Sequence, residues 1–154
     1  MVLVQRILDR LAKHGSAKAS GPVRVSNATR QVELAYRVDV ADNGRKRRKG
    51  LLGRESLAAG EGMWIVPCEA VHTLGMRFAI DLVYLDRNNM VMKIRHGVPP
   101  WRMSACFSAH SVLELASGSV RRTGTMPGDR LEITLQGSQV LQTPACDRTN
   151  YKRK

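Results

Sequence analysis

Residues 64–86, WIVPCEAVHTLGMRFAIDLVYLD, decide the fold. The last part of this stretch, residues 80–85, is apolar at every position except Asp81. An apolar run of this kind is typical of a strand that is covered on both faces. It is followed by a turn, DRNN at 86–89, whose asparagines tolerate positive φ. We therefore expect a hairpin with residues 90–96, placed centrally in a sheet.

Alternation of apolar and polar residues predicts further strands. The clearest cases are residues 32–40 and 129–135, where every second side chain is apolar. Residues 22–26, 62–66 and 112–116 are also expected to be extended. Period-two patterns of this kind bury one face of a strand. In the longest segment, the face expected to be buried consists of Val32, Leu34, Tyr36, Val38 and Val40.

A helix is expected near residues 44–53, with Asp42 or Asn43 as its N-cap. Its first turn, RKRRK at 45–49, is basic, which opposes the helix dipole by a few tenths of a kcal/mol or more. Gly50 inside such a helix costs about 1 kcal/mol relative to alanine. A sequence that accepts both costs is using the cations, or is letting another backbone approach closely at Gly50.

The chain of 154 residues is long enough for one domain with its own core. We divide it into an N-terminal amphipathic helix and linker (1–21), a single β-rich domain (22–136) and a basic, disordered tail (137–154). The expected fold class is mainly β, in the sense of a β-rich α+β protein. Its architecture is predicted to be a small, partly open barrel or sandwich of six to seven short strands with one or two short helices.

The positive charge is concentrated in two places. The formal net charge is +12, and the run at 45–49 supplies five of these charges while residues 152–154 supply three. Local basicity of this kind suits an anionic partner, and polyanion contact is one hypothesis for the run. The competing interpretation is a pair of solvated charged segments. The residues of the run are Arg45, Lys46, Arg47, Arg48 and Lys49.

We expect a cytoplasmic protein with reduced thiols. The chain has an odd number of cysteines, which argues against a disulfide framework: Cys68, Cys106 and Cys146. No apolar run approaches the roughly 20 residues of a membrane helix. Charges at Arg6, Asp9 and Arg10 interrupt the N-terminus, so it does not have the apolar core of a secretory signal.

Several short motifs occur in a fixed order. They are Gly50-Leu51-Leu52-Gly53-Arg54, Gly62-Met63, HTLGMRFAID from His72 to Asp81, Pro100-Trp101-Arg102, Val112-Leu113-Glu114 with Gly118, and Gly128-Asp129. In this order and spacing, from about residue 23 to residue 135, the chain resembles the domain of unknown function 192 family of uncharacterised bacterial and archaeal proteins. The resemblance implies a compact, mostly β fold with small helices. It implies no reaction, and it does not extend to the two ends of the chain.

Polar side chains interrupt apolar surroundings at four positions. His72 and Thr73 break an apolar stretch, Asp81 opens an apolar run, and Glu114 lies between apolar neighbours. Such groups are expensive to bury unless they meet one another or a ligand, and strand ends converge at the mouth of a small barrel. We therefore predict a ligand-binding site that comprises Arg54, His72, Thr73, Met76, Asp81, Arg102 and Glu114.

Three function hypotheses follow from these residues. The first is a binding module that takes a small anionic ligand or an acidic partner in an Arg/His-lined pocket. The second is a hydrolase-like enzyme that uses His72 with Asp81 or with Cys68. The third is a structural or interaction protein without a small-molecule site. In that case His72 and Asp81 satisfy backbone groups, and Glu114 forms a buried bridge to an arginine: Arg54, Arg77 or Arg102.

Two Cys-x₃-His pairs raise the possibility of a zinc site. Residues four apart on a strand share a face, so two such pairs could supply a Cys₂His₂ set. The usual zinc spacings differ, and small buried cysteines are the competing interpretation. We expect no cofactor. The candidate ligands are Cys68, His72, Cys106 and His110.

Other common sites are absent from the sequence. The glycines at 118, 124 and 128 precede no Lys-Ser/Thr pair, so there is no phosphate loop, and there is no G-x-S-x-G elbow. Aromatic residues make up 5% of the chain and are not interleaved with the basic ones. This composition weakens a nucleic-acid interpretation of Trp64 and Trp101, for which packing is the alternative.

Overall fold

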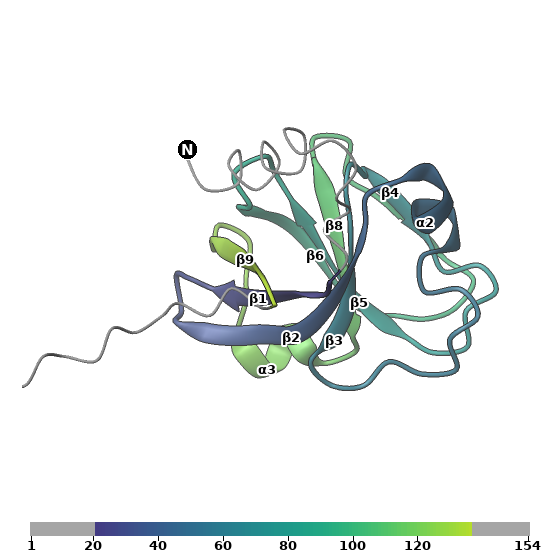
Figure 1. Ribbon diagram of the computed structural model, residues 1–154, viewed down its shortest axis with the longest axis horizontal. Helices are drawn as coiled ribbons and strands as arrows, with labels where there is room; N and C mark the ends of the chain where they lie inside the picture. Colours follow the sequence, from purple (N-terminus) through teal and green to yellow (C-terminus); the bar gives the residue numbers. More distant parts are fainter. Residues whose placement is uncertain (1–20, 137–154) are drawn as a thin grey trace, which may run out of the picture.

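A seven-stranded sheet curls through the part of the chain that the computed structural model describes, residues 21–136 (Figure 1). Its strand order is β6-β5-β8-β3-β2-β1-β9. Neighbouring strands are antiparallel except β2 and β3, which run parallel. The strands are β1 (Val23–Asn27), β2 (Val32–Ala41), β3 (Glu61–Ile65), β5 (Ile80–Leu85), β6 (Val91–Val98), β8 (Ser111–Ala116) and β9 (Leu131–Leu135).

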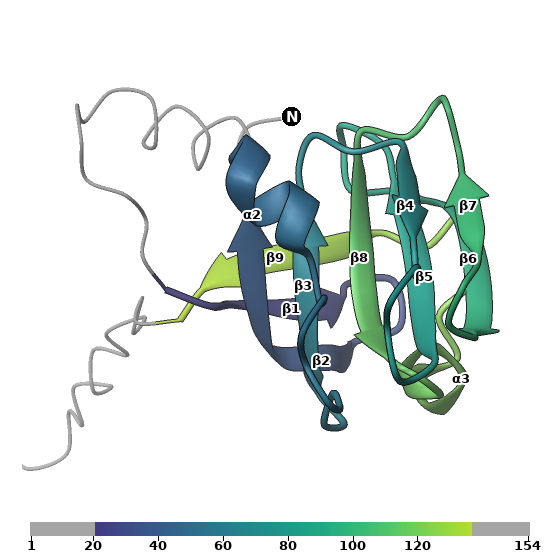
Figure 2. The ribbon, with the colours of Figure 1, turned by 90° about the vertical axis from the view of Figure 1, so that its right-hand side faces the viewer.

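A second layer covers part of this sheet. It contains a two-stranded antiparallel sheet of β4 (Ala70–His72) and β7 (Met103–Ala105). Two short helices complete the described region, α2 (Gly44–Lys49) and α3 (Ser119–Thr123). The two helices lie at opposite ends of the molecule (Figure 2).

The edges of the main sheet meet at one corner, which Asp129 fixes. Its carboxylate accepts hydrogen bonds from Asn27 Nδ2 (2.9 Å), Arg30 Nε (2.6 Å) and the amide of Met126 (3.0 Å). Burial alone would raise the pKa of this carboxyl, but these hydrogen bonds hold the pKa below its usual range. The carbonyl of Asp129 also accepts from the amide of Val91 at 2.8 Å, at the start of β6. The curled sheet is therefore a half barrel that is joined at one corner.

Two hydrophobic clusters lie on opposite faces of the sheet. The inner cluster fills the curl and includes Leu34, Val83, Leu113 and Leu131. The outer cluster lies between the other face and the covering layer, and it includes Leu51, Ile65, Val71, Leu82 and Val112. Strands β5 and β8 contribute to both clusters, and all six residues of each strand are buried.

The structure confirms the predicted fold class, a mainly β and partly open barrel with short helices. The predicted hairpin is also confirmed, because β5 and β6 pair antiparallel with Val83 opposite Ile94. Asn43 is the N-cap of α2, and its side chain accepts from the amide of Lys46 at 3.0 Å. The helix ends earlier than expected because Gly50, at φ +47°, leaves the helical conformation.

Strand β2 departs from simple alternation. Its pairing with β1 contains register shifts, which are typical of a β-bulge. The amides of Tyr36 and Arg37 both donate to the carbonyl of Gly60, at 2.9 and 3.1 Å. Tyr36 turns outward as a result and is 44% exposed. The expectation that it shares a buried face with Leu34 is therefore wrong.

Strands β4 and β7 and helix α3 were not expected. A three-residue strand is too short to show a period of two, and α3 is a five-residue helix between two glycines in the left-handed region, Gly118 and Gly124. The predicted N-terminal helix and basic tail lie outside the described residues. Within residues 21–136, neither helix has the length and apolar character needed to cross a membrane.

Strands β3 and β8 approach each other closely at Gly62. A Cβ atom here would lie 2.5 Å from the carbonyl oxygen of Glu114 and 2.8 Å from Cδ2 of Leu115. The nearer of these two atoms belongs to the backbone, which moves only if the strands separate. Gly62 therefore allows the spacing of β3 and β8.

We expect Gly62→Ala to destabilise the fold by about 1–3 kcal/mol, because the added methyl group overpacks against the backbone of β8. Gly21→Ala is the matched control, since a Cβ atom there meets nothing within 4 Å. Urea denaturation followed by circular dichroism measures both variants. Equal free energies of unfolding for the two variants would contradict the close approach.

Candidate functional site

A pocket of about 460 Å³ opens on the outer face of the main sheet, between α2 and the segment that leads into β4. Its volume lies within the range of roughly 300–1,000 Å³ that is typical of small-molecule sites. Helix α2 contributes cations to one side, and residues 67–72 form the other side. Apolar side chains of the outer cluster line the walls, and Glu114 is the residue of β8 that reaches the pocket.

Glu114 rises from an apolar floor. In the sheet it lies between Met63 on β3 and Leu82 on β5, and both of these side chains belong to the outer cluster. Glu114 is only 4% exposed, and its Oε2 atom has no hydrogen-bond partner. Burial raises the pKa of this carboxyl to about 7. The pocket therefore contains a polar group that residues 21–136 leave unsatisfied.

Gly50 lies directly beside this carboxyl. A Cβ atom on Gly50 would be 3.8 Å from Oε2 of Glu114, so the backbone after α2 passes close to the floor of the pocket. Its φ of +47° is a conformation that residues with a side chain rarely adopt. No backbone of another element comes within 4 Å of this Cβ position, so the neighbour of Gly50 is the carboxyl of Glu114 and not the second backbone that was expected.

The cations of α2 line the rim. None of the six residues of α2 is buried, so the helix contributes to neither hydrophobic cluster. Three of its basic residues line the pocket: Arg47, Arg48 and Lys49. Neither Arg48 nor Lys49 forms a salt bridge within residues 21–136, whereas Lys46 pairs with Asp42 at 3.4 Å. On the opposite side His72 is exposed at the end of β4.

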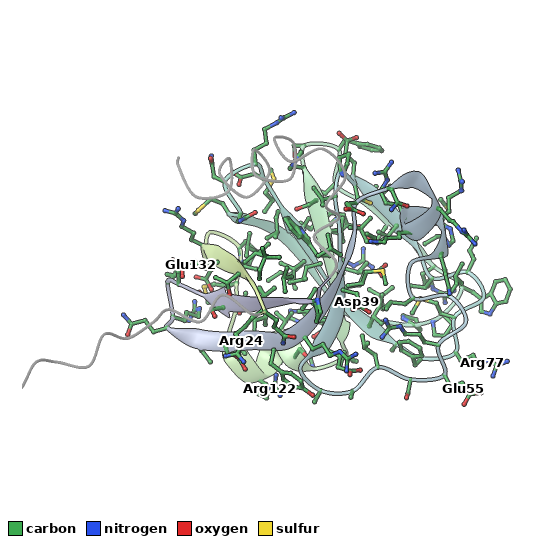
Figure 3. All side chains as sticks on the ribbon, in the orientation of Figure 1. Arg24, Asp39, Glu55, Arg77, Arg122 and Glu132 are labelled. Carbon is green, nitrogen blue, oxygen red and sulfur yellow. The ribbon has the colours of Figure 1, made fainter. Side chains whose placement is uncertain are left out.

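Glu114 forms no bridge to an arginine, so that structural expectation is wrong for the described residues. Arg54 pairs with Asp39, and Arg102 donates from Nη1 to the carbonyl of Trp101 at 3.1 Å. Arg77 pairs with Glu55 at 3.4 Å, and both side chains lie at the periphery of the molecule (Figure 3). These three arginines do not reach Glu114 because their guanidinium groups bind partners outside the pocket.

Asp81 lies on the other face of the sheet from Glu114. Its neighbours along β5 on that face, Val83 and Leu85, belong to the inner cluster. The carboxylate accepts from the amides of Gly97 (2.8 Å) and Val120 (3.1 Å), and it thereby fastens α3 to the sheet. The enzyme hypothesis requires Asp81 to pair with His72, and the structure does not place the two side chains together.

Thr73 also has a structural place. Its hydroxyl donates to the carbonyl of Pro99 at 2.8 Å and accepts from the amide of Arg102 at 2.9 Å. These bonds fasten the turn that holds Trp101 at φ +63°. Of the seven residues predicted for the ligand site, the structure brings three together in the pocket: His72, Met76 and Glu114.

The thiol of Cys68 lines the same pocket. Burial is the main reason that its pKa is raised, and the nearby Glu114 adds to this effect. A raised pKa keeps the sulfur as a thiol, which is the weaker nucleophile and metal ligand. Within residues 21–136 no three His, Cys, Asp or Glu side chains gather in a way that could hold a metal ion.

The position of α2 at the pocket was not expected from the sequence. We expected the basic run to be a separate contact for polyanions, because periodicity does not show which loop a helix end will face. The available signal was Gly50, which follows the run directly and begins the first motif of the resemblance. Glycine is the usual residue where the backbone takes a positive φ or passes close to a ligand.

A family model matches the part of the chain that forms this pocket. The family model DUF192 (Uncharacterized ACR) matches residues 25–133, and this range contains every residue that lines the pocket. The chain belongs to the DUF192 family. The predicted resemblance is thereby confirmed.

This DUF192 protein is similar to a UPF0127 protein and to two solved structures. A UPF0127 protein from Pyrococcus furiosus is 32% identical over 112 residues, which cover 69% of this chain and 94% of the relative. Two solved structures each have a TM-score of 0.61 and 25% identity, and each covers 72% of this chain. One, from Sinorhizobium meliloti 1021, is named as a candidate transcription regulator and is covered over 91% of its length. The other, from Novosphingobium aromaticivorans DSM 12444, is a protein of unknown function and is covered over 83%.

Burial of Glu114 predicts that this DUF192 protein loses stability as pH rises. The unfolded chain releases the glutamate proton near pH 4.5, whereas the folded protein holds it until about pH 7. Between these values folding requires uptake of a proton, so stability falls across this window and stays low above it. At roughly 1.4 kcal/mol per pKa unit, the total cost is about 3 kcal/mol.

We expect Glu114→Gln to remove this dependence. The amide has nearly the same shape and no charge, so its stability relative to wild type should improve by about 2–3 kcal/mol between pH 5 and pH 8. Urea denaturation of both proteins at each pH gives this difference directly. The assignment fails if the difference between the two proteins is the same at both pH values.

For Asp81 we expect substitution to destabilise the protein, in contrast to Glu114. Asp81→Asn keeps the shape but turns an acceptor into a donor that faces a backbone N–H, which costs about 1–3 kcal/mol. Because Asp81 lies on the inner face, the variant should leave any ligand affinity of the pocket unchanged. Thermal unfolding and ligand titration separate the two effects. A loss of affinity without a loss of stability would return Asp81 to the site.

Proposed function

We propose that this DUF192 protein binds a small anionic ligand in the pocket between α2 and β4. The observation that carries the proposal is the unsatisfied polar character of this pocket. Cations without salt bridges in residues 21–136 line its rim, and a buried carboxyl without a partner lies at its floor. Charged and polar groups held at a concave surface stabilise a bound ligand more than they stabilise the empty protein.

The composition of α2 supports an anionic ligand. The helix buries none of its side chains, and four basic residues in its last turn follow one another directly. Mutual repulsion of these cations is unfavourable, and the core gains nothing in return. An anion at the rim would relieve this repulsion and would accept hydrogen bonds from the guanidinium groups of Arg47 and Arg48.

The pocket favours a small ligand over a long polyanion. Of the five basic residues of α2, only Arg47, Arg48 and Lys49 line the pocket. The amine of Lys46 is directed to Asp42 and to the carbonyl of Val40, at 3.4 and 3.3 Å. Arg47 also donates from Nη1 to the carbonyl of Asp42, at 3.2 Å, whereas Arg48 and Lys49 make no side-chain hydrogen bond or salt bridge within residues 21–136. A compact anion at this concave site can therefore contact more than one rim cation.

Two other functions receive less support. The enzyme hypothesis needs His72 to act with Asp81 or with Cys68. Asp81 lies on the inner face of the sheet, away from His72. Burial raises the pKa of the Cys68 thiol, which disfavours the reactive thiolate. The candidate transcription regulator from Sinorhizobium suggests DNA binding. A helix-turn-helix requires two adjacent helices, however, and α2 and α3 lie at opposite ends of the described region (Figure 2).

The proposal predicts that small acids stabilise the protein against heat. A ligand at 100 times its Kd adds roughly 2.7 kcal/mol to the free energy of unfolding, which a thermal-shift screen of phosphates and carboxylates detects. Arg47→Gln with Arg48→Gln should abolish this stabilisation and leave the unliganded melting temperature nearly unchanged, since neither side chain is buried.

The matched control removes two arginines from the other end of the molecule. Arg121→Gln with Arg122→Gln changes α3, and Figure 3 shows Arg122 far from α2. This control should keep the stabilisation by acids. If both double variants lose it equally, the effect is one of overall charge, and the pocket is not the binding site.

A further inference from the structure

The floor and the rim of the pocket have opposite chemistry. The rim carries cations from α2, whereas the floor carries the carboxyl of Glu114. A simple anion that filled the whole pocket would approach this carboxyl, and its presence would weaken binding. The arrangement therefore calls for a ligand whose two ends differ.

We propose that the ligand is a small zwitterion. Its acidic group, a carboxylate or a phosphate, contacts Arg47 and Arg48 at the rim, and its ammonium group donates to the carboxylate of Glu114 at the floor. The inference rests on the proposed function and deepens it, because it adds the second half of the ligand. The apolar walls, which include Leu51, Ile65 and Met76, suit the carbon chain between the two ends.

No group within residues 21–136 already serves as this donor. Strands β3 and β5 place Met63 and Leu82 beside Glu114, and neither is titratable. The covering segment contributes Cys68, Glu69 and His72, and α2 contributes Arg47, Arg48 and Lys49. None of these donates a hydrogen bond to Oε2, which is fully enclosed by the protein.

Glu114 and Gly50 line the pocket together. A Cβ atom at residue 50 would lie 3.8 Å from Oε2, in ordinary van der Waals contact, and Oε2 itself is enclosed in the empty protein. A ligand ammonium that opens this contact would gain a charge-assisted hydrogen bond in a poorly solvated environment. The same bond would satisfy the buried oxygen, which otherwise costs the protein stability.

Binding of an ammonium group is coupled to pH. In the empty pocket burial keeps Glu114 largely protonated below about pH 7. The ammonium favours the ionised carboxylate, so binding below this pH releases a proton. Affinity should rise by up to about tenfold between pH 6 and pH 8, and a carboxylate that contacts only the rim, which stays ionised across this range, should not show this rise. For the phosphate pair the comparison is between the two members, because both phosphates change charge in this range.

The test uses matched pairs of probes on the full chain. Glycine, β-alanine and γ-aminobutyrate are compared with acetate, propionate and butyrate, and phosphoethanolamine is compared with ethyl phosphate. The first arm tests a carboxylate and the second a phosphate, and the chain-length series reports the distance between rim and floor. Isothermal titration calorimetry at pH 6 and pH 8 gives affinities, and buffers of different ionisation enthalpy give the number of protons released.

We expect the wild-type protein to prefer the amine-bearing member of at least one pair by tenfold or more at pH 8. Glu114→Gln should reduce this preference to about twofold or less and should abolish the proton release. Glu132→Gln, on β9 at the other side of the molecule (Figure 3), is the matched control and should keep both. His72 and Glu69 are unchanged in all three proteins, so neither side chain produces the difference.

Two results would overturn the inference. If each acid binds as well as its amine-bearing partner, with no proton release in wild type, the zwitterion is wrong while anion binding at the rim stands. If neither member of any pair binds to wild type, and the screen of acids also gives no stabilisation, the proposed function fails together with this inference. Proton release is measured on the wild-type protein, so the test does not depend on the folding of the Glu114→Gln variant.

Discussion

The structure depends on the burial of β8 on both of its faces. The strand lies in the middle of the curled sheet, between β5 and β3, and its side chains alternate between the inner and the outer cluster. Gly62 allows β3 to pack closely against it. Because every residue of β8 is enclosed, a polar side chain on this strand must either find a partner or remain unsatisfied. Glu114 is such a residue, and it adds an unpaired polar group to the apolar outer face.

The outer layer forms a pocket over this buried carboxyl. The segment after α2 and the strand β4 cover the outer cluster but leave a hollow above Glu114. The inner face solves the same problem differently, since Asp81 is satisfied by two backbone amides, from Gly97 and Val120. Two acidic residues on adjacent strands therefore have contrasting roles. Asp81 stabilises the fold through these hydrogen bonds, whereas Glu114 is buried with its Oε2 atom unpaired within residues 21–136.

Much of the fold could be predicted from the sequence, because long strands leave a readable period. The apolar run at 80–85 and the turn after it identified the central hairpin, and the short motifs identified the family. The site was harder to predict. Asp81 and Glu114 give the same signal, a carboxyl among apolar neighbours, and only the direction of each side chain separates them. The bulge in β2 and the position of α2 over the pocket also depend on tertiary contacts that no local pattern records.

The parallel pairing of β2 with β3 has a consequence for how the pocket is built. Parallel neighbours require a crossover, and residues 42–60 provide it by passing over the outer face and carrying α2. The crossover is anchored to the sheet at its two ends, so the wall that it forms is not tied into the strand ladder beneath it. A molecule that fills the pocket would therefore touch a floor fixed by strand pairing and a wall carried on a single span of chain.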